Sequence, residues 1–164
     1  MNMTATAMPT EGRISRQGLF PIDRVDGART FATAPDVFHH VDTNFRLWGL
    51  FTRSTATMET HGRVFQLNAR AALREAFKKV SEDLMSLAFT QSQIVWICEN
   101  RSELLAENGA ATFFLFESYG RLFVAYVTKV ADGTRWLHAA RLTTSEPEMW
   151  DGDKGHRIIT RCDL

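Results

Sequence analysis

The chain has 164 residues, enough for one domain with a buried core, and 45% of them are hydrophobic while 23% are charged. Nineteen basic residues balance nineteen acidic ones, so there is no overall field to attract nucleic acid or an anionic membrane. No apolar run approaches the roughly 18 residues of a membrane span, and the N-terminus lacks the basic start and apolar core of a secretory signal. We therefore expect a cytoplasmic protein without a membrane partner.

Residues 1–26 are dominated by Met, Thr, Ala, Gly, Pro and Arg and show no sustained periodicity. This pattern predicts a flexible arm, followed by a single domain at residues 27–164. Leu19 and Phe20 belong to an apolar segment within the arm, residues 18–22. We expect this segment to dock on the domain, or else to act as a short motif for a protein partner.

The first part of the domain offers short segments only. Pro35 would start one or two helical turns over residues 37–41. Alternating large residues predict a strand over residues 44–52, and a second strand is predicted at residues 64–67. The dipeptide His61-Gly62 is expected to turn a short hairpin ahead of that second strand.

Residues 68–89 are predicted to form the one long helix. Asn68 is a good N-cap, and apolar residues recur after it at the three- and four-residue spacing of one helical face. Residues 93–98 are expected to be a buried strand, with the end of the helix as the alternative. Ser102 is expected to cap a short second helix, which runs to Glu107.

Three strands follow, over residues 112–118, 121–131 and 134–143, because these runs are rich in aromatic and β-branched residues. The dipeptides Tyr119-Gly120 and Asp132-Gly133 predict two-residue hairpin turns between them. This register places Phe116 opposite Phe123. Both faces of the resulting meander are apolar, so we expect each to be covered by the chain itself or by a partner.

After the meander, Ser145 and Glu148 have the spacing of a capping box, residues 151–155 predict a polar turn, and residues 157–162 predict a last strand. The pattern as a whole predicts an α+β fold. We expect a mainly antiparallel sheet of about five to seven strands with a C-terminal meander, packed against one long amphipathic helix and accompanied by a short second helix.

The sequence contains no common catalytic, metal-binding or cofactor-binding motif. His-Glu-x-x-His, Cys-x-x-Cys, the phosphate-binding glycine loops and Gly-x-Ser-x-Gly are all missing from the chain. Cys98 and Cys162 each lie in an apolar run, which is typical of free buried thiols. We therefore expect no metal site, no cofactor and no catalytic residue.

The leading hypothesis is a non-enzymatic protein-binding or regulatory module, with self-association as one form of that binding. The chain has four Trp, twelve Phe and six Met, and large amphipathic side chains make good interface anchors. The partner is then another protein or a second copy of the chain. The residues expected to contact it are Trp136, Trp150, Met149, Tyr126, Trp48, Leu19 and Phe20.

Two alternatives remain open. One is a small metal-independent nuclease or RNA-binding domain, in which a histidine base works beside cations that stabilise a phosphorane. Its catalytic residues would be His138, His156, Arg141 and Arg157, although the neutral net charge does not favour a nucleic-acid partner. The other is a sensor that binds a small apolar ligand between the sheet and the helix.

Overall fold

The computed structural model describes residues 14–142 and 145–164. Its strands are β1 (Ile14–Ile22), β2 (His40–Val41), β3 (Thr60–Leu67), β4 (Ala71–Ala72), β5 (Ala111–Ser118), β6 (Arg121–Lys129), β7 (Arg135–Arg141), β8 (Met149–Trp150) and β9 (Arg157–Cys162). The α-helices are α1 (Asn44–Leu47), α2 (Leu73–Lys78) and α3 (Gln91–Asn100). Short 3-10 helices are η1 (Phe31–Thr33), η2 (Leu84–Leu87) and η3 (Ser102–Leu104).

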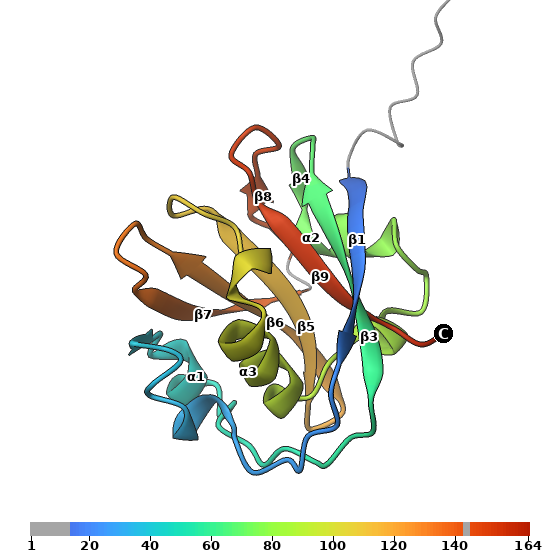
Figure 1. The fold of residues 1–164 in the computed structure, drawn as a ribbon. Coiled ribbons are helices and arrows are strands. Elements are labelled where there is room, and N and C mark those ends of the chain that lie inside the picture. Colours follow the sequence, from blue (N-terminus) through green and yellow to red (C-terminus); the bar gives the residue numbers. More distant parts are fainter. Residues whose placement is uncertain (1–13, 143–144) are drawn as a thin grey trace, which may run out of the picture.

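Seven strands form the main sheet, in the order β1-β3-β9-β5-β6-β7-β2, and β4 pairs with β8 in a separate two-stranded sheet (Figure 1). Within the main sheet, the β9–β5 and β7–β2 pairs are parallel, and the other neighbours are antiparallel. The fold is therefore α+β with a mixed, mostly antiparallel sheet and few helices. At this level the sequence prediction is confirmed.

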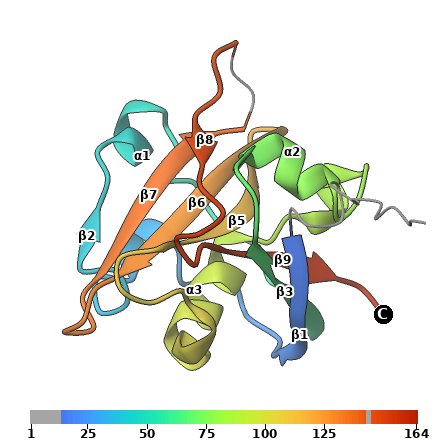
Figure 2. The ribbon, with the colours of Figure 1, turned by 90° about the horizontal axis from the view of Figure 1, so that it is seen from above.

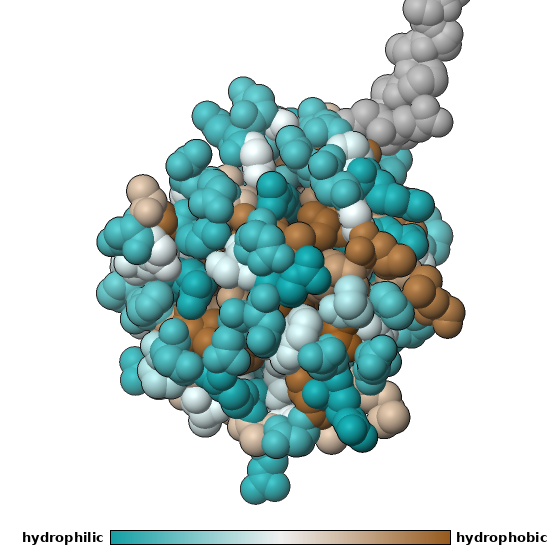
Figure 3. Space-filling model, in the orientation of Figure 1, coloured by the Kyte–Doolittle hydropathy of each residue, from teal (hydrophilic) through white to brown (hydrophobic). Residues whose placement is uncertain are grey.

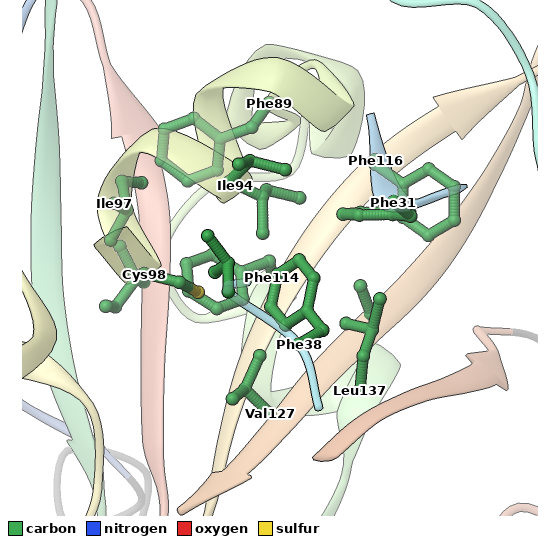
Figure 4. Close-up of a cluster of buried hydrophobic side chains, with 14 of the residues drawn as sticks. Phe31, Phe38, Phe89, Ile94, Ile97, Cys98, Phe114, Phe116, Val127 and Leu137 are labelled. Atoms are coloured by element: carbon green, nitrogen blue, oxygen red, sulfur yellow. The ribbon is translucent and has the colours of Figure 1, made fainter. Parts of the chain in front are cut away.

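Each face of the sheet carries its own hydrophobic core. Helix α3 packs on one face, where its apolar side chains meet those of β5, β6 and β7 (Figure 4). Helix α2, η2 and the β4–β8 pair cover the other face, so the sheet lies between two layers (Figure 2). We call the α3 side the first face and the α2 side the second face. The fully buried side chains of the first core include Phe31, Phe38, Phe45, Phe114, Phe116, Ile94 and Ile97.

The predicted long helix over residues 68–89 is wrong, because only Leu73–Lys78 forms an α-helix there. The start of the segment is drawn into a strand, where Ala71 pairs with Trp150. Its middle is broken at Ser81, whose hydroxyl accepts a hydrogen bond from the Asp83 N–H at 3.1 Å. A serine side chain that bonds the backbone in this way competes with helix continuation. The apolar positions are still buried, but by separate short elements.

The strand predicted at residues 93–98 is also wrong, because this segment is the middle of α3. Thr90 begins the helix by accepting from the Gln93 N–H at 3.2 Å, while Gln93 Oε1 accepts from the Thr90 N–H at 2.9 Å. Nearly all sides of α3 are buried, so its sequence lacks the apolar stripe of a surface helix. A short apolar run of this kind has the same pattern as a buried strand.

Near the N-terminus, residues 14–22 form the edge strand β1, although the sequence assigned them to the flexible arm. Phe20 and Ile22 anchor this strand because both side chains are buried. The remainder of the predicted arm, up to residue 13, lies outside the described residues. Glycine 62 lies inside β3 and does not turn a hairpin: the ring of Phe20 fills the space where its side chain would be.

The predicted strand at residues 44–52 is replaced by the single helical turn α1. Asp42 starts that turn, since its Oδ1 accepts from the Asn44 N–H at 3.0 Å. Residues 40–41, predicted as part of a helical turn, form β2 instead. No helix follows Ser145 in residues 145–148, where the chain runs on to β8. The short second helix, predicted from Ser102 to Glu107, is present only as the 3-10 helix η3.

The register of β5 and β6 agrees with the prediction, since Phe116 pairs with Phe123 across the two-residue turn. The register of β6 and β7 differs by one residue: Phe123 pairs with Arg141 and not with Leu142. The reason is a three-residue loop between Val130 and Thr134, in which the Gly133 N–H donates to the Val130 carbonyl at 2.9 Å. A shift of one residue exchanges the two faces of a strand, so every side chain of β7 lies on the face opposite to the predicted one.

The last strand, β9, forms over the predicted residues 157–162. It does not pair with β7, the last of the three consecutive strands β5, β6 and β7. It returns to lie between β3 and β5, so the strands predicted as a C-terminal meander occupy the middle of the sheet. The preceding residues 151–155 form the predicted turn.

Candidate functional site

An unbroken series of rings crosses the second face of the sheet. The ring of His40 stacks on Trp136, with centroids 3.9 Å apart, and Trp136 is followed by His138 at 6.4 Å. His138 stacks on Tyr126 at 4.6 Å, and Tyr126 meets Trp150 edge to face at 5.2 Å. We call these five residues the aromatic strip. They come from β2, β7, β6 and β8, four elements that are distant in sequence.

Strand register explains why these rings meet. Trp136 and His138 are two residues apart on β7, so both side chains project from the same face. Tyr126 is the direct partner of His138 on β6, and His40 is the direct partner of Trp136 on β2. Trp150 reaches the series from outside the main sheet, because β8 lies over this face.

The strip is most exposed near β2, where His40 is exposed and Trp136 is 42% exposed. The rings of His138, Tyr126 and Trp150 are half-buried. Met149, the neighbour of Trp150 on β8 but not a member of the strip, is 41% exposed. Burial also raises the pKa of the Tyr126 hydroxyl, and the carboxylates of Glu148 and Asp42 add to the effect. The tyrosine therefore stays neutral at physiological pH, as suits an apolar contact surface.

His138 is held in place by stacking and by one hydrogen bond. Its Nε2 lies 3.2 Å from the Thr128 hydroxyl, a contact in which either group can donate. Burial lowers the pKa of His138, and the negative charge of Asp42 opposes this only in part. The neutral imidazole is consequently the stable form within the stack.

His156 supports Trp150, the last ring of the strip. Its ring packs edge to face against Trp150, with centroids 5.2 Å apart, and against Phe113 at 5.8 Å. Its Nδ1 accepts from the Ala111 N–H at 2.9 Å, so the ring proton of the neutral form resides on Nε2. Burial lowers the pKa of this histidine as well. These contacts assign His156 to the support of Trp150.

The structure brings three of the seven predicted partner-binding residues into the strip: Trp136, Tyr126 and Trp150. Met149 precedes Trp150 on β8 and is exposed. Leu19 is 48% exposed but lies on β1, at the other end of the sheet. Trp48 packs against the core of the first face. Phe20 is only 3% exposed, so its ring belongs to the core and is not accessible to a partner.

The four residues of the predicted nuclease site do not share a face. His138 and His156 contact the rings of the second face. Arg141 lies over Trp48 on the first face, with its Cζ 4.6 Å from the ring centroid. Arg157 also projects from the first face, where its guanidinium donates to the Leu104 carbonyl at 2.8 Å. The sheet therefore separates the candidate base from the candidate cations.

His40 is the member of the strip that the sequence did not reveal. It lies in a two-residue strand, which is too short to produce an alternation pattern. The adjacent histidines at positions 39 and 40 were a signal, but nothing in the sequence indicated which of them faces Trp136. His39 is used differently: its Nδ1 accepts from the Arg135 N–H at 2.9 Å.

The space between α3 and the sheet, where a small ligand was predicted to bind, is filled by the side chains of the first core (Figure 4). A groove of about 590 Å³ lies on the outer side of that layer, between α3 and two loops. On this side of the molecule hydrophilic groups predominate and hydrophobic ones form small separate clusters (Figure 3). The groove is lined by Arg24, Val25, Asp26, Arg29, Ala56, Thr57, Met58, Ser92, Val95, Trp96 and Glu99.

Within residues 14–142 and 145–164, no three His, Cys, Asp or Glu side chains gather closely enough to hold a metal ion. Among the helices of the same residues, none has the length and apolar character needed to cross a membrane.

Comparison of the chain with protein-family models, with curated proteins and with solved structures found no match.

Proposed function

We propose that the protein is a non-enzymatic protein-binding module and that the aromatic strip is its contact surface. The observation that carries this proposal is the exposure of Trp136 within a continuous series of rings, with the exposed Met149 next to the last ring, Trp150. Exposed aromatic and Met side chains above well-packed neighbours are typical of the centre of an interface. The surrounding rings hold Trp136 in one position, so binding costs little side-chain entropy.

The arrangement of the rings favours a protein over a nucleic acid as the partner. Single-stranded nucleic acids bind to aromatic residues through free ring faces, on which the bases stack. In the strip, Trp136 already stacks on His40, with centroids 3.9 Å apart, and lies nearly parallel to His138 at 6.4 Å. A ring that is engaged in this way has less free face to offer a base, whereas its exposed part suits contacts with the apolar side chains of a protein.

The first test is self-association. Light scattering over the low to high micromolar range would show a weight-average mass that rises with concentration for the wild-type chain. Replacing both exposed hydrophobic residues in the double variant Trp136→Ala, Met149→Ala should keep the protein monomeric. Tyr119→Ala is the matched control, because Tyr119 is an 83% exposed aromatic residue in a turn outside the strip.

If the wild type is monomeric throughout that range, a different protein is the expected partner. A photoreactive amino acid at position 136 should then cross-link to a defined protein in cells, and the same group at position 119 should not. A monomeric chain whose positions 136 and 119 cross-link equally would refute the proposed function.

A further inference from the structure

A second site, which shares no residue with the aromatic strip, lies where β6 begins and β7 ends. It is a cleft of about 690 Å³, within the range of small-molecule sites. Three arginines from three different elements line it: Arg74 of α2, Arg121 of β6 and Arg141 of β7. We call it the arginine cleft, and its lining is completed by Leu47, Trp48, Met85, Gly120, Leu122, Phe123 and Leu142.

Arg141 is held in a fixed orientation. Its guanidinium lies over the indole of Trp48, 4.6 Å from the ring centroid. Its strand position is set by the pairing with Phe123, and Arg121 lies two residues before Phe123, on the same face. A guanidinium that stacks on an aromatic ring keeps the N–H groups at its edge available, and these match the two oxygens of a carboxylate or phosphate.

Two of the three arginines of the cleft, Arg121 and Arg141, have no counter-charge among the described residues. No Asp or Glu belongs to its lining. In the part of the chain that the structure describes, neither Arg121 nor Arg141 takes part in an ion pair. The carboxylate nearest in the hairpin, that of Glu117, accepts from the Gly120 N–H at 2.8 Å and so serves the turn. Neighbouring positive groups without a counter-charge attract an anion.

The cleft also offers apolar surface. Leu47 is 73% exposed and Met85 is 45% exposed, on elements that approach the cleft from opposite faces of the sheet. The rings of Trp48 and Phe123 line the space between them. A ligand that carries only charge would leave this surface uncovered, and a purely apolar one would leave Arg121 and Arg141 without a counter-ion.

We propose that the arginine cleft binds a small soluble molecule that carries an oxyanion, phosphate or carboxylate, on an aromatic body. The oxyanion contacts Arg121 and Arg141, and the aromatic body packs against Phe123, Leu47 and Met85. Recognition requires both parts together, since each satisfies a different portion of the lining.

The test uses 1-naphthyl phosphate as the probe and the indole N–H signal of Trp48 in NMR spectra as the readout, assigned with Trp48→Phe. The probe should bind saturably and more tightly than 1-naphthol or inorganic phosphate. Arg121→Gln and Arg141→Gln should each weaken binding of the probe about tenfold, because each removes a charge-assisted contact. Neither change should affect 1-naphthol. Arg141→Lys should lose part of the affinity, since an ammonium lacks the planar fork.

Arg46→Gln is the matched control, because Arg46 is an exposed arginine of α1 outside the lining. Equal affinities for 1-naphthyl phosphate and 1-naphthol would overturn the proposal, and so would Arg121→Gln with wild-type affinity for the probe. Binding to phosphatidic acid vesicles without binding of the soluble probe would indicate a lipid surface and would also overturn it. Thermal unfolding of each variant identifies any variant that has lost its fold. If Arg141→Gln does not fold, Arg121→Gln still tests the proposal.

Discussion

The imidazole of His138 lies flat against the ring of Tyr126, with the centroids 4.6 Å apart and the planes inclined by 13°. The two residues are direct partners on neighbouring strands, so the register of β6 and β7 creates the contact. The stack buries His138 in its neutral form, and this has a consequence for stability at different pH values.

Stability should fall as the pH is lowered below about 6.5, the ordinary pKa of histidine. Burial lowers the pKa of both His138 and His156 in the folded protein. Between the folded and unfolded pKa values the unfolded chain binds more protons, so the free energy of unfolding rises with pH in that window. The contribution is complete above the unfolded pKa and is lost as the pH falls through the folded pKa.

Urea unfolding followed by tryptophan fluorescence at a series of pH values would measure this effect. His138→Phe retains a stacking ring without an ionisable group, so its stability should depend less on pH than that of the wild type. His61→Gln serves as a control for the loss of a histidine outside the strip. Identical pH dependence in the wild type and His138→Phe would show that the buried imidazole contributes nothing.

Gly62→Ala should destabilise the protein by about 1–3 kcal/mol, the usual range for overpacking. A Cβ at position 62 would overlap Cζ of the Phe20 ring, which is itself buried. Chemical denaturation measures the loss, and Gly18→Ala on β1 is the control, because nothing lies within 4 Å of a Cβ there. Adding Phe20→Leu to Gly62→Ala should recover part of the stability; no difference between the two alanine variants would contradict the expectation.

Gln91→Met should cost about 2–4 kcal/mol, because it leaves buried backbone groups without partners. Gln91 Oε1 accepts from the Phe31 N–H at 3.1 Å, and its Nε2 donates to the Leu50 carbonyl at 2.9 Å. This one side chain therefore ties two loops to α3. The exposed Gln17→Met provides the comparison in the same denaturation experiment, and losses of similar size in both variants would argue against a special role for Gln91.

The two cysteines should differ in reactivity. Burial raises the pKa of the Cys98 thiol to about 12, whereas Cys162 is partly exposed. Because the thiolate is the reactive form, a thiol reagent at mildly alkaline pH should modify only Cys162 in the folded protein, and Cys98 only after unfolding. Cys162→Ser should abolish the fast reaction, whereas rapid modification of both thiols in the wild type would contradict this expectation.

The comparison of sequence and structure shows which features local patterns can determine. The turn at Tyr119-Gly120 requires positive φ at both positions, and the structure has φ of 54° and 76° there. The Asp132-Gly133 dipeptide suits a two-residue turn equally, but it also suits a three-residue loop in which only the glycine has positive φ. The structure uses the second form, with Gly133 at φ 88°. The sequence does not distinguish the two-residue turn from the three-residue loop. This difference of one residue in loop length determines the face on which every β7 side chain lies.

The helices show a different limit. Apolar spacing identified Leu73, Ala76 and Phe77 as one buried face, and these residues are buried in α2. The spacing could not show that the helix begins only at Leu73, where the pairing of β4 with β8 ends, or that it stops at Lys78, shortly before the Ser81 side chain bonds the backbone. For α3 the opposite problem arises, because burial on nearly every side removes the pattern by which a helix is recognised.

For the candidate site, composition drew attention to Trp136, Tyr126 and Trp150, and the structure places all three in the strip. Their grouping follows from the register of β7 and from the position of β8, neither of which local sequence determines. The separation of His138 from Arg141 could be predicted, because residues three apart on a strand project from opposite faces. The arginine cleft could not, since α1, α2 and β6 meet there only in three dimensions.

The position of β9 between β3 and β5 bears on the order in which the sheet can be completed during synthesis. On the ribosome, the β1–β3 pair and the group of β5, β6 and β7 emerge first, and the edges of β3 and β5 that face β9 in the folded sheet have no neighbour yet. Only when residues 157–162 leave the exit tunnel can the two groups be joined. Until that moment the nascent chain displays these two strand edges, which can pair with other chains.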